Sequence, residues 1–421
     1  MPERETEFAH AIDPQSGCET ATLPDARDQG DRPGPVPGLT VLHVFGTLDR
    51  GGSETAIMNL YRRINRDCLR FDFVCHRQAP WAFEEEIRAL GGRIYVAPRY
   101  KVWNHRSYMR WWSCLFANHP EIAVVHGHVH GTAAMYLSAA RSAGKTTIAH
   151  SHTTRHGGSL AVRAAKRLFS PRIVRSADYL FACGIEAGQF MFGTSACTSS
   201  RFRVIHNAID VDVFTLNPQV RAAVRAELDV RDQILVGHVG RFDYSKNHEF
   251  LLEAFAALLQ LEPTSSLLLV GDGPLRHATE QRAKSLGVSE SVIFAGVRPD
   301  VHRLMQAMDV LVFPSRFEGL GVVLIEAQAA GLHALASSAV PAAAKVTPEL
   351  EFLSLGEKPE TWAARVQVLA HRSRRDTRTE IASAGYDVAQ VAVELQHFYE
   401  QAISRDRGDR RNPSESTVSS R

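Results

Sequence analysis

Two glutamates in the stretch RFEGLGVVLIEAQAAG (residues 316–331) stand out as candidates for chemistry. Glu318 and Glu326 lie eight positions apart, and only glycine and aliphatic residues separate them. A carboxylate without a polar partner in an apolar setting costs free energy. Sugar hydroxyls can supply such a partner, because an ionised carboxylate accepts hydrogen bonds from them. The pattern therefore predicts a site that holds sugar hydroxyl groups.

Two further stretches carry groups that suit phosphate. In VGHVGRFDYSKNHEFLLEAF, Arg241 and Lys246 lie five positions apart, between a predicted strand and a predicted helix. Two cations beside a helix N-terminus suit a diphosphate, although a solvated pair of loop charges is the plain alternative. In FGTLDRGGSETAIMNL, Gly51 and Gly52 lie at a similar turn. Backbone N–H groups there can meet an anion, or the glycines can simply form a tight turn.

Histidines gather in VVHGHVHG and IAHSHTTRH. His126, His128 and His130 alternate along one strand face, as do His150 and His152. Histidines at strand ends can bind a metal, but no carboxylate or cysteine accompanies these at ligand spacing. We therefore expect one of them to contact a polar ligand and the others to be structural.

The elements that must position these residues alternate between strand and helix. Short β-branched runs such as TVLHVF, FDFVC, ILVGHV and VLVFPS are separated by helical stretches. Near-continuous apolar strands of this kind indicate buried parallel sheets. The predicted fold class is α/β, with two doubly wound Rossmann-like domains that face each other across a cleft. Ligands bind at the carboxyl ends of the strands in such sheets.

The series of strands restarts near Ile234, which predicts two domains joined by a polar connection over 214–232. The final helix carries Val388, Val391, Leu395 and Phe398 on one face and is expected to pack on the first domain. The predicted divisions are a disordered segment 1–37, a first domain 38–214, a second domain 232–378, a helix 379–404 and a disordered tail 405–421.

Composition narrows the class of protein. The formal net charge of +2 does not favour nucleic acid as a partner. None of the six cysteines forms a CxxC pair, no apolar run approaches the ~18–20 residues that a membrane span requires, and no signal-like N-terminus is visible. We expect a cytoplasmic protein, or one peripheral on the inner face of the plasma membrane. The stretch 155–175 has several Arg and Lys and no acidic residue, so it suits either an anionic membrane surface or a solvated helix face.

The chain resembles the retaining glycosyltransferases of family four, which have the two-domain GT-B fold. The motif that carries the resemblance is EGLGVVLIEAQAAG, supported by GGSE, HSHTT, RVIHNAIDVDVF, GRFDYSKNHEFLLEAF and LLLVGDGPLR. It covers about residues 40–400 and is closest to the capsular and exopolysaccharide glycosyltransferases. A retaining transfer of sugar from a nucleotide-diphosphate donor to a growing, lipid-linked glycan is what the resemblance implies.

Residue roles also follow from the resemblance. Glu318 would hold hydroxyls of the donor sugar, His128 would contact that sugar near the reacting carbon, and Arg241 and Lys246 would neutralise the leaving diphosphate. The remaining implied donor contacts are backbone amides of Gly51, Gly52, Gly319 and Leu320, the ribose contact of Glu326, and the base contact near Val297 and Arg298. The resemblance implies no metal ion, a UDP-sugar as the first donor to expect, and a glycan acceptor linked to polyprenyl diphosphate.

Two positions depart from the family pattern. Gly321 and His333 stand where relatives usually have proline, and Gly321 is expected to loosen the loop that shapes the sugar pocket. Two alternatives therefore stay open: a nucleotide-sugar epimerase on the same fold, and a degenerate partner subunit that binds donor without turnover. Redox chemistry with NAD is disfavoured, because the first strand–helix turn lacks GxGxxG.

Overall fold

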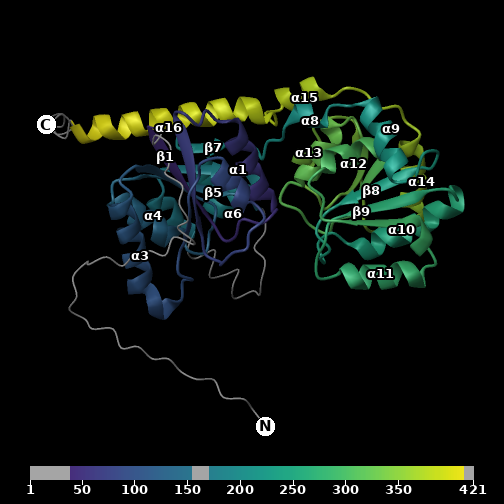
Figure 1. Cartoon of the computed structure of the whole chain (residues 1–421), viewed down its shortest axis with the longest axis horizontal. Coiled ribbons are helices and arrows are strands. Elements are labelled where there is room, and N and C mark those ends of the chain that lie inside the picture. The colour runs from purple at the N-terminus through teal and green to yellow at the C-terminus, as the bar shows by residue number, and fades with distance from the viewer. Residues whose placement is uncertain (1–37, 154–169, 412–421) are drawn as a thin grey trace, which may run out of the picture.

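The computed structural model describes residues 38–153 and 170–411, which form two domains side by side (Figure 1). The first domain contains a parallel seven-stranded sheet in the order β3-β2-β1-β4-β5-β6-β7. Its strands are β1 Leu39–Phe45, β2 Leu69–Cys75, β3 Ile94–Val96, β4 Ile122–Gly127, β5 Thr146–Ser151, β6 Tyr179–Ala182 and β7 Phe202–Val204.

Helices cover both faces of this sheet, and one hydrophobic core fills the space on each side. Strands buried on both faces must be apolar almost throughout, which explains runs such as LTVLHVF in β1. The helices are α1 Gly52–Arg63, α2 Glu84–Ala89, α3 His105–Asn118, α4 Ala133–Ser142, α6 Ile185–Phe192 and α7 Thr194–Cys197, with a 3₁₀ turn η1 Val102–Asn104.

The second domain repeats this plan with a parallel six-stranded sheet in the order β10-β9-β8-β11-β12-β13. Its strands are β8 Leu235–Val239, β9 Ser266–Val270, β10 Val292–Gly296, β11 Val310–Phe313, β12 His333–Ser337 and β13 Leu350–Leu353. Its helices are α8 Val211–Phe214, α9 Pro218–Glu227, α10 His248–Leu261, α11 Arg276–Ser285, α12 Val301–Ala307, α13 Val322–Ala329, α14 Pro359–Ala370 and α15 Arg378–Ser383, with 3₁₀ turns η2 Ser289–Ser291 and η3 Ala342–Ala344.

Each sheet has one point at which the strand order reverses. In the first domain it lies between β1 and β4, and in the second between β8 and β11. The loops after these strands diverge and leave a crevice at the carboxyl ends of the strands, where ligands of doubly wound folds bind. The observed architecture is the expected α/β fold with two Rossmann-like domains.

The chain crosses between the domains twice. The first crossing lies near Ile209, and the second near Asp387; the two residues form a parallel β-bridge. The segment 214–232, predicted as a polar connection, differs from that expectation: most of it forms α9. Val224 of α9 and Val230 belong to the core of the second domain, because they point at α12 and the sheet.

The last helix, α16 (Val388–Arg411), returns to the first domain and lies along it (yellow in Figure 1). Val388, Val391, Leu395 and Phe398 are buried in the core that covers β1 and β2. Tyr399 is buried in the same core. The segments predicted to be disordered, 1–37 and the end of 405–421, and most of the basic stretch 155–175 lie outside the described residues. Within residues 38–153 and 170–411, no helix is both long and apolar enough to cross a membrane.

Candidate active site

The reversal point of the second sheet brings two of the predicted site residues into contact. Lys246 lies in the loop after β8, and Glu318 lies in the loop after the neighbouring strand β11. Lys246 Nζ is 2.6 Å from Glu318 Oε1, and both side chains are largely buried. The backbone joins the same loops, because Arg316 N donates to Ser245 O at 2.7 Å. A cation suited to a diphosphate thus lies directly beside a carboxylate suited to sugar hydroxyls.

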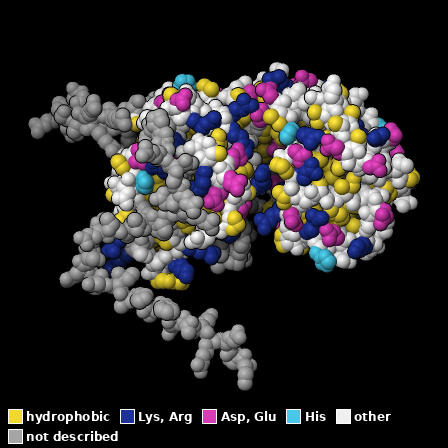
Figure 2. Space-filling model, in the orientation of Figure 1, with side chains coloured by type: hydrophobic (Ala, Val, Ile, Leu, Met, Phe, Trp, Pro, Cys, Tyr) yellow, Lys and Arg dark blue, Asp and Glu magenta, His cyan; other side chains and the backbone are white. Residues whose placement is uncertain are grey.

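A patch of positive charge surrounds this ion pair. The Lys246 ammonium lies 4.6 Å from the centre of the Phe313 ring, which holds the long side chain in place. Arg241, five residues earlier, is exposed and makes no ion pair with any described residue. Arg316 adds a third cation that the sequence analysis did not single out; its guanidinium lies 4.7 Å from the centre of the Tyr244 ring. Figure 2 shows basic side chains along the furrow between the domains.

The residues after Glu318 reach across to the first domain. A Cβ atom at Gly319 would lie 3.0 Å from the carbonyl oxygen of His152, so only glycine allows this approach without a shift. Gly319 and Leu320 also form one wall of a cavity of about 340 Å³ between the domains. The rest of its lining comes from residues 183–187, Val204 and His206 on one side and from Pro341, Ala343 and Tyr386 on the other.

The two departures from the family pattern have different structural contexts. Gly321 caps α13 with a φ of +81°, a left-handed conformation that proline cannot adopt because its ring fixes φ near −65°. Glycine here therefore permits a backbone path that proline could not take, and the loosened loop stays an expectation. His333 begins β12, at the amino end of the strand and away from the cleft edge, and its Nε2 lies 3.2 Å from Ser373 O.

Glu326 lies on α13, more than one turn beyond Gly321. Its carboxyl group makes no hydrogen bond or ion pair with any residue in the described ranges. Desolvation raises the pKa of Glu326 to about 7, because burial penalises the charged form. A partner that donates hydrogen bonds, such as a pair of ribose hydroxyls, would restore its charge.

Val297 and Arg298, the predicted base contacts, follow β10, two strands away from β8. The side chain of Val297 is 60% exposed, which leaves an apolar surface for a planar ring. Arg298 is held by two hydrogen bonds to Asp300 at 2.7 and 2.6 Å, and this contact lowers the pKa of Asp300. Two strand spacings, about 10 Å, separate β10 from β8.

Gly51 and Gly52 lie where predicted, at the start of α1 after β1. The Gly51 N–H already donates to Asp49 O at 2.8 Å, and the Glu54 carboxylate folds back over Gly51. Desolvation raises the pKa of Glu54, and Ser53 donates a hydrogen bond to it at 2.7 Å. A phosphate contact at this turn therefore depends on Gly52 and on movement of Glu54.

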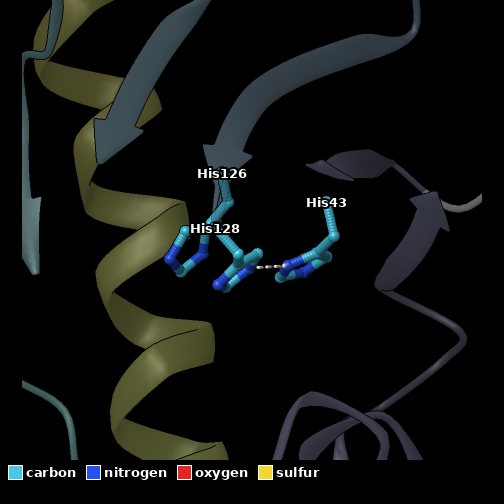
Figure 3. A group of neighbouring side chains, drawn as sticks. All are labelled: His43, His126 and His128. Atoms are coloured by element: carbon cyan, nitrogen blue, oxygen red, sulfur yellow. Dashed lines mark hydrogen bonds between the residues drawn. The ribbon is translucent and has the colours of Figure 1, made fainter. Parts of the chain in front are cut away.

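The histidines form two hydrogen-bonded rows at the carboxyl end of the first sheet. In the first row, His43 Nδ1 lies 3.0 Å from His128 Nε2, and His128 Nδ1 lies 2.8 Å from His152 Nε2 (Figure 3 shows the first pair). This row ends at Asn207, whose Oδ1 lies 3.1 Å from His152 Nδ1.

The second row stacks on the first. Tyr399 Oη lies 2.7 Å from His126 Nδ1, and His126 Nε2 lies 3.0 Å from His150 Nδ1. The ring centres of His150 and His152 are 4.0 Å apart. Burial and the neighbouring imidazoles lower the pKa of all five rings, to about 3 for His43 and His152, so the rows are neutral.

Neutrality assigns every proton in the first row. The Asn207 oxygen only accepts, so His152 Nδ1 carries the proton and His152 Nε2 accepts from His128. His128 Nε2 then accepts from His43 Nδ1, and His43 Nε2 is left buried without a partner among the described residues. Both ring nitrogens of His128 are used. A sugar hydroxyl can hydrogen-bond to this ring only if one of the two bonds opens, so the predicted donor contact of His128 stays a prediction.

Two groups of three histidines have ring nitrogens within 4.8 Å of one another: His43, His126 and His128, and His128, His150 and His152. Each member already shares a proton with a neighbouring imidazole, hydroxyl or amide. Three nitrogens around one zinc ion at about 2.1 Å must each point a lone pair at the ion. The rows therefore have the geometry of a hydrogen-bonded network, which is different from that of a metal centre.

Sequence reasoning missed His43, Asn207 and Tyr399, although each shapes this network. The sequence shows His43 within the predicted strand TVLHVF, but only the structure shows that this strand pairs with the strand of His126. No signal in the sequence places Asn207 beside His152 or Tyr399 beside His126, because these contacts join distant segments.

Comparison with known proteins identifies the family of both domains. Residues 50–213 match the family described as Glycosyltransferase Family 4, and residues 220–388 match the one described as Glycosyl transferases group 1. EpsF from Bacillus subtilis (strain 168), described as a glycosyltransferase, is 35% identical over 376 residues, which cover 87% of this chain and 97% of EpsF. The Vi polysaccharide biosynthesis protein VipC/TviE from Salmonella typhi is 40% identical over 104 residues, 25% of this chain and 18% of its own length.

Solved structures share the fold. Anabaena Alr3699/HepE in complex with UDP and glucose superposes with a TM-score of 0.66 at 18% identity, covering 88% of this chain and 100% of HepE. WaaG, a glycosyltransferase involved in lipopolysaccharide biosynthesis, gives a TM-score of 0.59 at 17% identity, and the match covers 89% of this chain and 100% of WaaG. The chain therefore belongs to glycosyltransferase family 4, with the two-domain GT-B fold, and is related to enzymes of exopolysaccharide biosynthesis.

Proposed function

We propose that this protein moves a sugar from a nucleotide-diphosphate donor, with UDP-sugar as the first candidate, onto a growing lipid-linked glycan, with retention at the anomeric carbon. The contact of 2.6 Å between Lys246 and Glu318 carries the proposal. It joins a group for the leaving phosphate and a group for the sugar at one point, where the sugar–phosphate bond must lie. The UDP and glucose bound to HepE support this choice of donor.

In the proposed reaction, the bond between the anomeric carbon and the phosphate oxygen breaks as an acceptor hydroxyl attacks from the same face. The acceptor proton passes to the departing phosphate. Lys246 and Arg241 stabilise the negative charge that develops on the diphosphate. Glu318 orients the sugar through its hydroxyls. We propose that these cations replace a divalent metal ion, and that the protein works at the cytosolic face of the membrane.

A thermal-shift panel tests the donor class. UDP, GDP, ADP, dTDP, CDP and their common sugar conjugates are added, without metal, to the wild type and to Glu326→Ala. A nucleotide at a hundred times its dissociation constant should add about 2.7 kcal/mol to the free energy of unfolding. We expect one base to stabilise the wild type and to lose most of this effect in the variant. Stabilisation by none of them would contradict the proposal, and donor conversion without acceptor would favour an epimerase.

The pH dependence of donor binding tests the role of Glu326. Its pKa of about 7 means that the carboxyl is largely protonated below neutral pH and cannot accept two ribose hydrogen bonds. Affinity for a UDP-sugar should therefore rise up to about tenfold per pH unit as pH approaches 7 and level off above it. A nucleotide sugar is used because free UDP has its own phosphate ionisation near pH 6. Glu326→Gln should bind weakly and show a flat profile; a wild-type profile that is equally flat would contradict the ribose contact.

A further inference from the structure

The cavity of about 340 Å³ between the domains lies apart from the proposed donor contacts. The first domain lines it with residues at and after the ends of β6 and β7, and the second domain lines it with the loops after β11 and β12. Strand β5 separates β6 from the reversal point of the first sheet, between β1 and β4. None of its described lining residues is one of the three side chains proposed for the reacting bond: Glu318, Lys246 and His128.

Three polar side chains that line this cavity can make further hydrogen bonds. Tyr386 is buried, and its hydroxyl makes no hydrogen bond with a described residue. His206 Nδ1 lies 3.2 Å from the carbonyl oxygen of Cys183 and therefore carries the ring proton. Burial lowers the pKa of His206, so the ring is neutral and its Nε2 can accept a hydrogen bond. Glu186 adds an exposed carboxylate that makes no ion pair with a described residue.

Two of these groups are fixed where the chain crosses between the domains. Tyr386 directly precedes Asp387, and His206 comes shortly before Ile209, its partner in the β-bridge. Ile209 N donates to Tyr386 O at 2.9 Å, and the ring centres of His206 and Tyr386 are 4.5 Å apart. These contacts hold the polar end of the cavity in one arrangement, which reduces the entropic cost of binding a ligand.

The rest of the lining favours a neutral ligand. No described lining residue is a lysine or an arginine, so a phosphate group would meet the Glu186 carboxylate without a cation to offset the repulsion. Most of the other lining side chains are apolar: Ile185, Ala187, Val204, Leu320, Pro341 and Ala343. Apolar walls with a few convergent polar groups are typical of small-molecule pockets. A sugar ring suits this composition, because its faces carry C–H groups and its rim carries hydroxyls.

We propose that this cavity binds the terminal sugar of the acceptor glycan. Gly319 and Leu320, which form one wall, directly follow Glu318, so the cavity adjoins the proposed position of the donor sugar. The donor sugar is bonded to a diphosphate and must stay beside Lys246, whereas a neutral acceptor sugar can occupy a space without cations. The inference rests on the proposed transfer reaction. It adds that the three polar side chains of the cavity select the acceptor by the positions of its hydroxyls.

Saturation-transfer NMR with octyl glycosides tests the proposal on the full chain. Octyl glycosides of glucose, galactose, N-acetylglucosamine and N-acetylgalactosamine are added, with UDP present, to the wild type and to Ala343→Trp. Ala343 is exposed and lines the cavity, so an indole there fills the space without displacing the core. We expect at least one glycoside to give a signal with the wild type and none with Ala343→Trp. Tyr386→Phe removes one neutral hydrogen-bonding group and should weaken binding about fivefold.

Ala342→Trp is the matched control. Ala342 is also exposed and precedes Ala343 in η3, but it does not line the cavity. This variant should bind the glycosides like the wild type, and calorimetry should show unchanged binding of UDP-glucose to all three variants.

Binding of no glycoside to the wild type, or equal binding by Ala343→Trp, would overturn the proposal. Weaker binding of UDP-glucose by Ala343→Trp, with UDP binding unchanged, would assign the cavity to the donor sugar and also overturn it. A wild type that binds glycosides in this cavity but binds neither UDP nor UDP-glucose would contradict the proposed donor alone.

Discussion

A Glu318→Gln variant is expected to lose about a hundredfold or more in kcat/KM for sugar transfer while it still binds a nucleoside diphosphate. The amide loses the charge that strengthens hydrogen bonds from two sugar hydroxyls. Charge-assisted hydrogen bonds are about twice as strong as neutral ones, so the loss amounts to about 3 kcal/mol, or roughly a hundredfold in rate. Lys246, now without its partner at 2.6 Å, stays available for the diphosphate.

Glu349→Gln is a matched control for this variant. Glu349 forms an ion pair of 2.6 Å with Arg375. It directly precedes β13 and so lies at the amino ends of the strands, whereas Glu318 lies at their carboxyl ends. Loss of the ion pair between Glu349 and Arg375 should lower the free energy of unfolding and leave kcat/KM unchanged. The rates are measured with a nucleotide sugar and an acceptor, and UDP binding is measured by calorimetry. Transfer by Glu318→Gln within a few-fold of the wild type would contradict the role of Glu318, and loss of both transfer and UDP binding would indicate a damaged site.

Mild acid is expected to unfold the protein through its imidazole rows. The five histidines of the rows have folded-state pKa values far below the usual 6.5, and all but the half-buried His152 are buried: His43, His126, His128, His150 and His152. The unfolded chain therefore takes up more protons than the folded chain once the pH falls below 6.5, and stability falls with it. Above 6.5 the rings are neutral in both states and contribute no slope.

The expected effect is large. Each ring contributes up to about 1.4 kcal/mol per pH unit, and five contribute up to about 7 kcal/mol per pH unit. The raised pKa of Glu326, about 7, makes the folded chain bind an extra proton between the unfolded pKa of Glu326 and pH 7, which stabilises the fold as pH falls. This effect involves one proton, whereas the histidine rows involve five. A typical stability of about 5–15 kcal/mol would be lost within one to two pH units below 6.5.

Urea unfolding in half-unit steps downward from neutral pH measures this slope. His150→Phe keeps a ring against His152 and removes one titrating group. The change in the free energy of unfolding per pH unit should therefore be smaller than in the wild type by up to about 1.4 kcal/mol. His397→Gln changes a histidine of α16 whose side chain is 67% exposed, and its slope should equal that of the wild type. A stability that stays level as pH falls would show that these rings do not titrate on unfolding as described.

The amino-acid sequence by itself determined the features that depend on local pattern. Continuous apolar runs separated by amphipathic ones establish parallel sheets covered by helices. Glycine-containing turns that follow predicted strands place Glu318, Lys246 and Gly52 at the carboxyl ends of β11, β8 and β1. The apolar face of α16 was readable for the same reason: Val388, Val391 and Leu395 recur at helical spacing.

Tertiary structure alone decided which of these turns meet. The contact between Lys246 and Glu318 depends on β8 and β11 being neighbours, and strand order arises from pairings between residues far apart in the sequence. His43 and His128 are 85 positions apart, and His126 and Tyr399 are 273 apart. Periodicity carries no information about contacts over such separations. The left-handed backbone of Gly321, at the N-cap of α13, was likewise visible only in the structure.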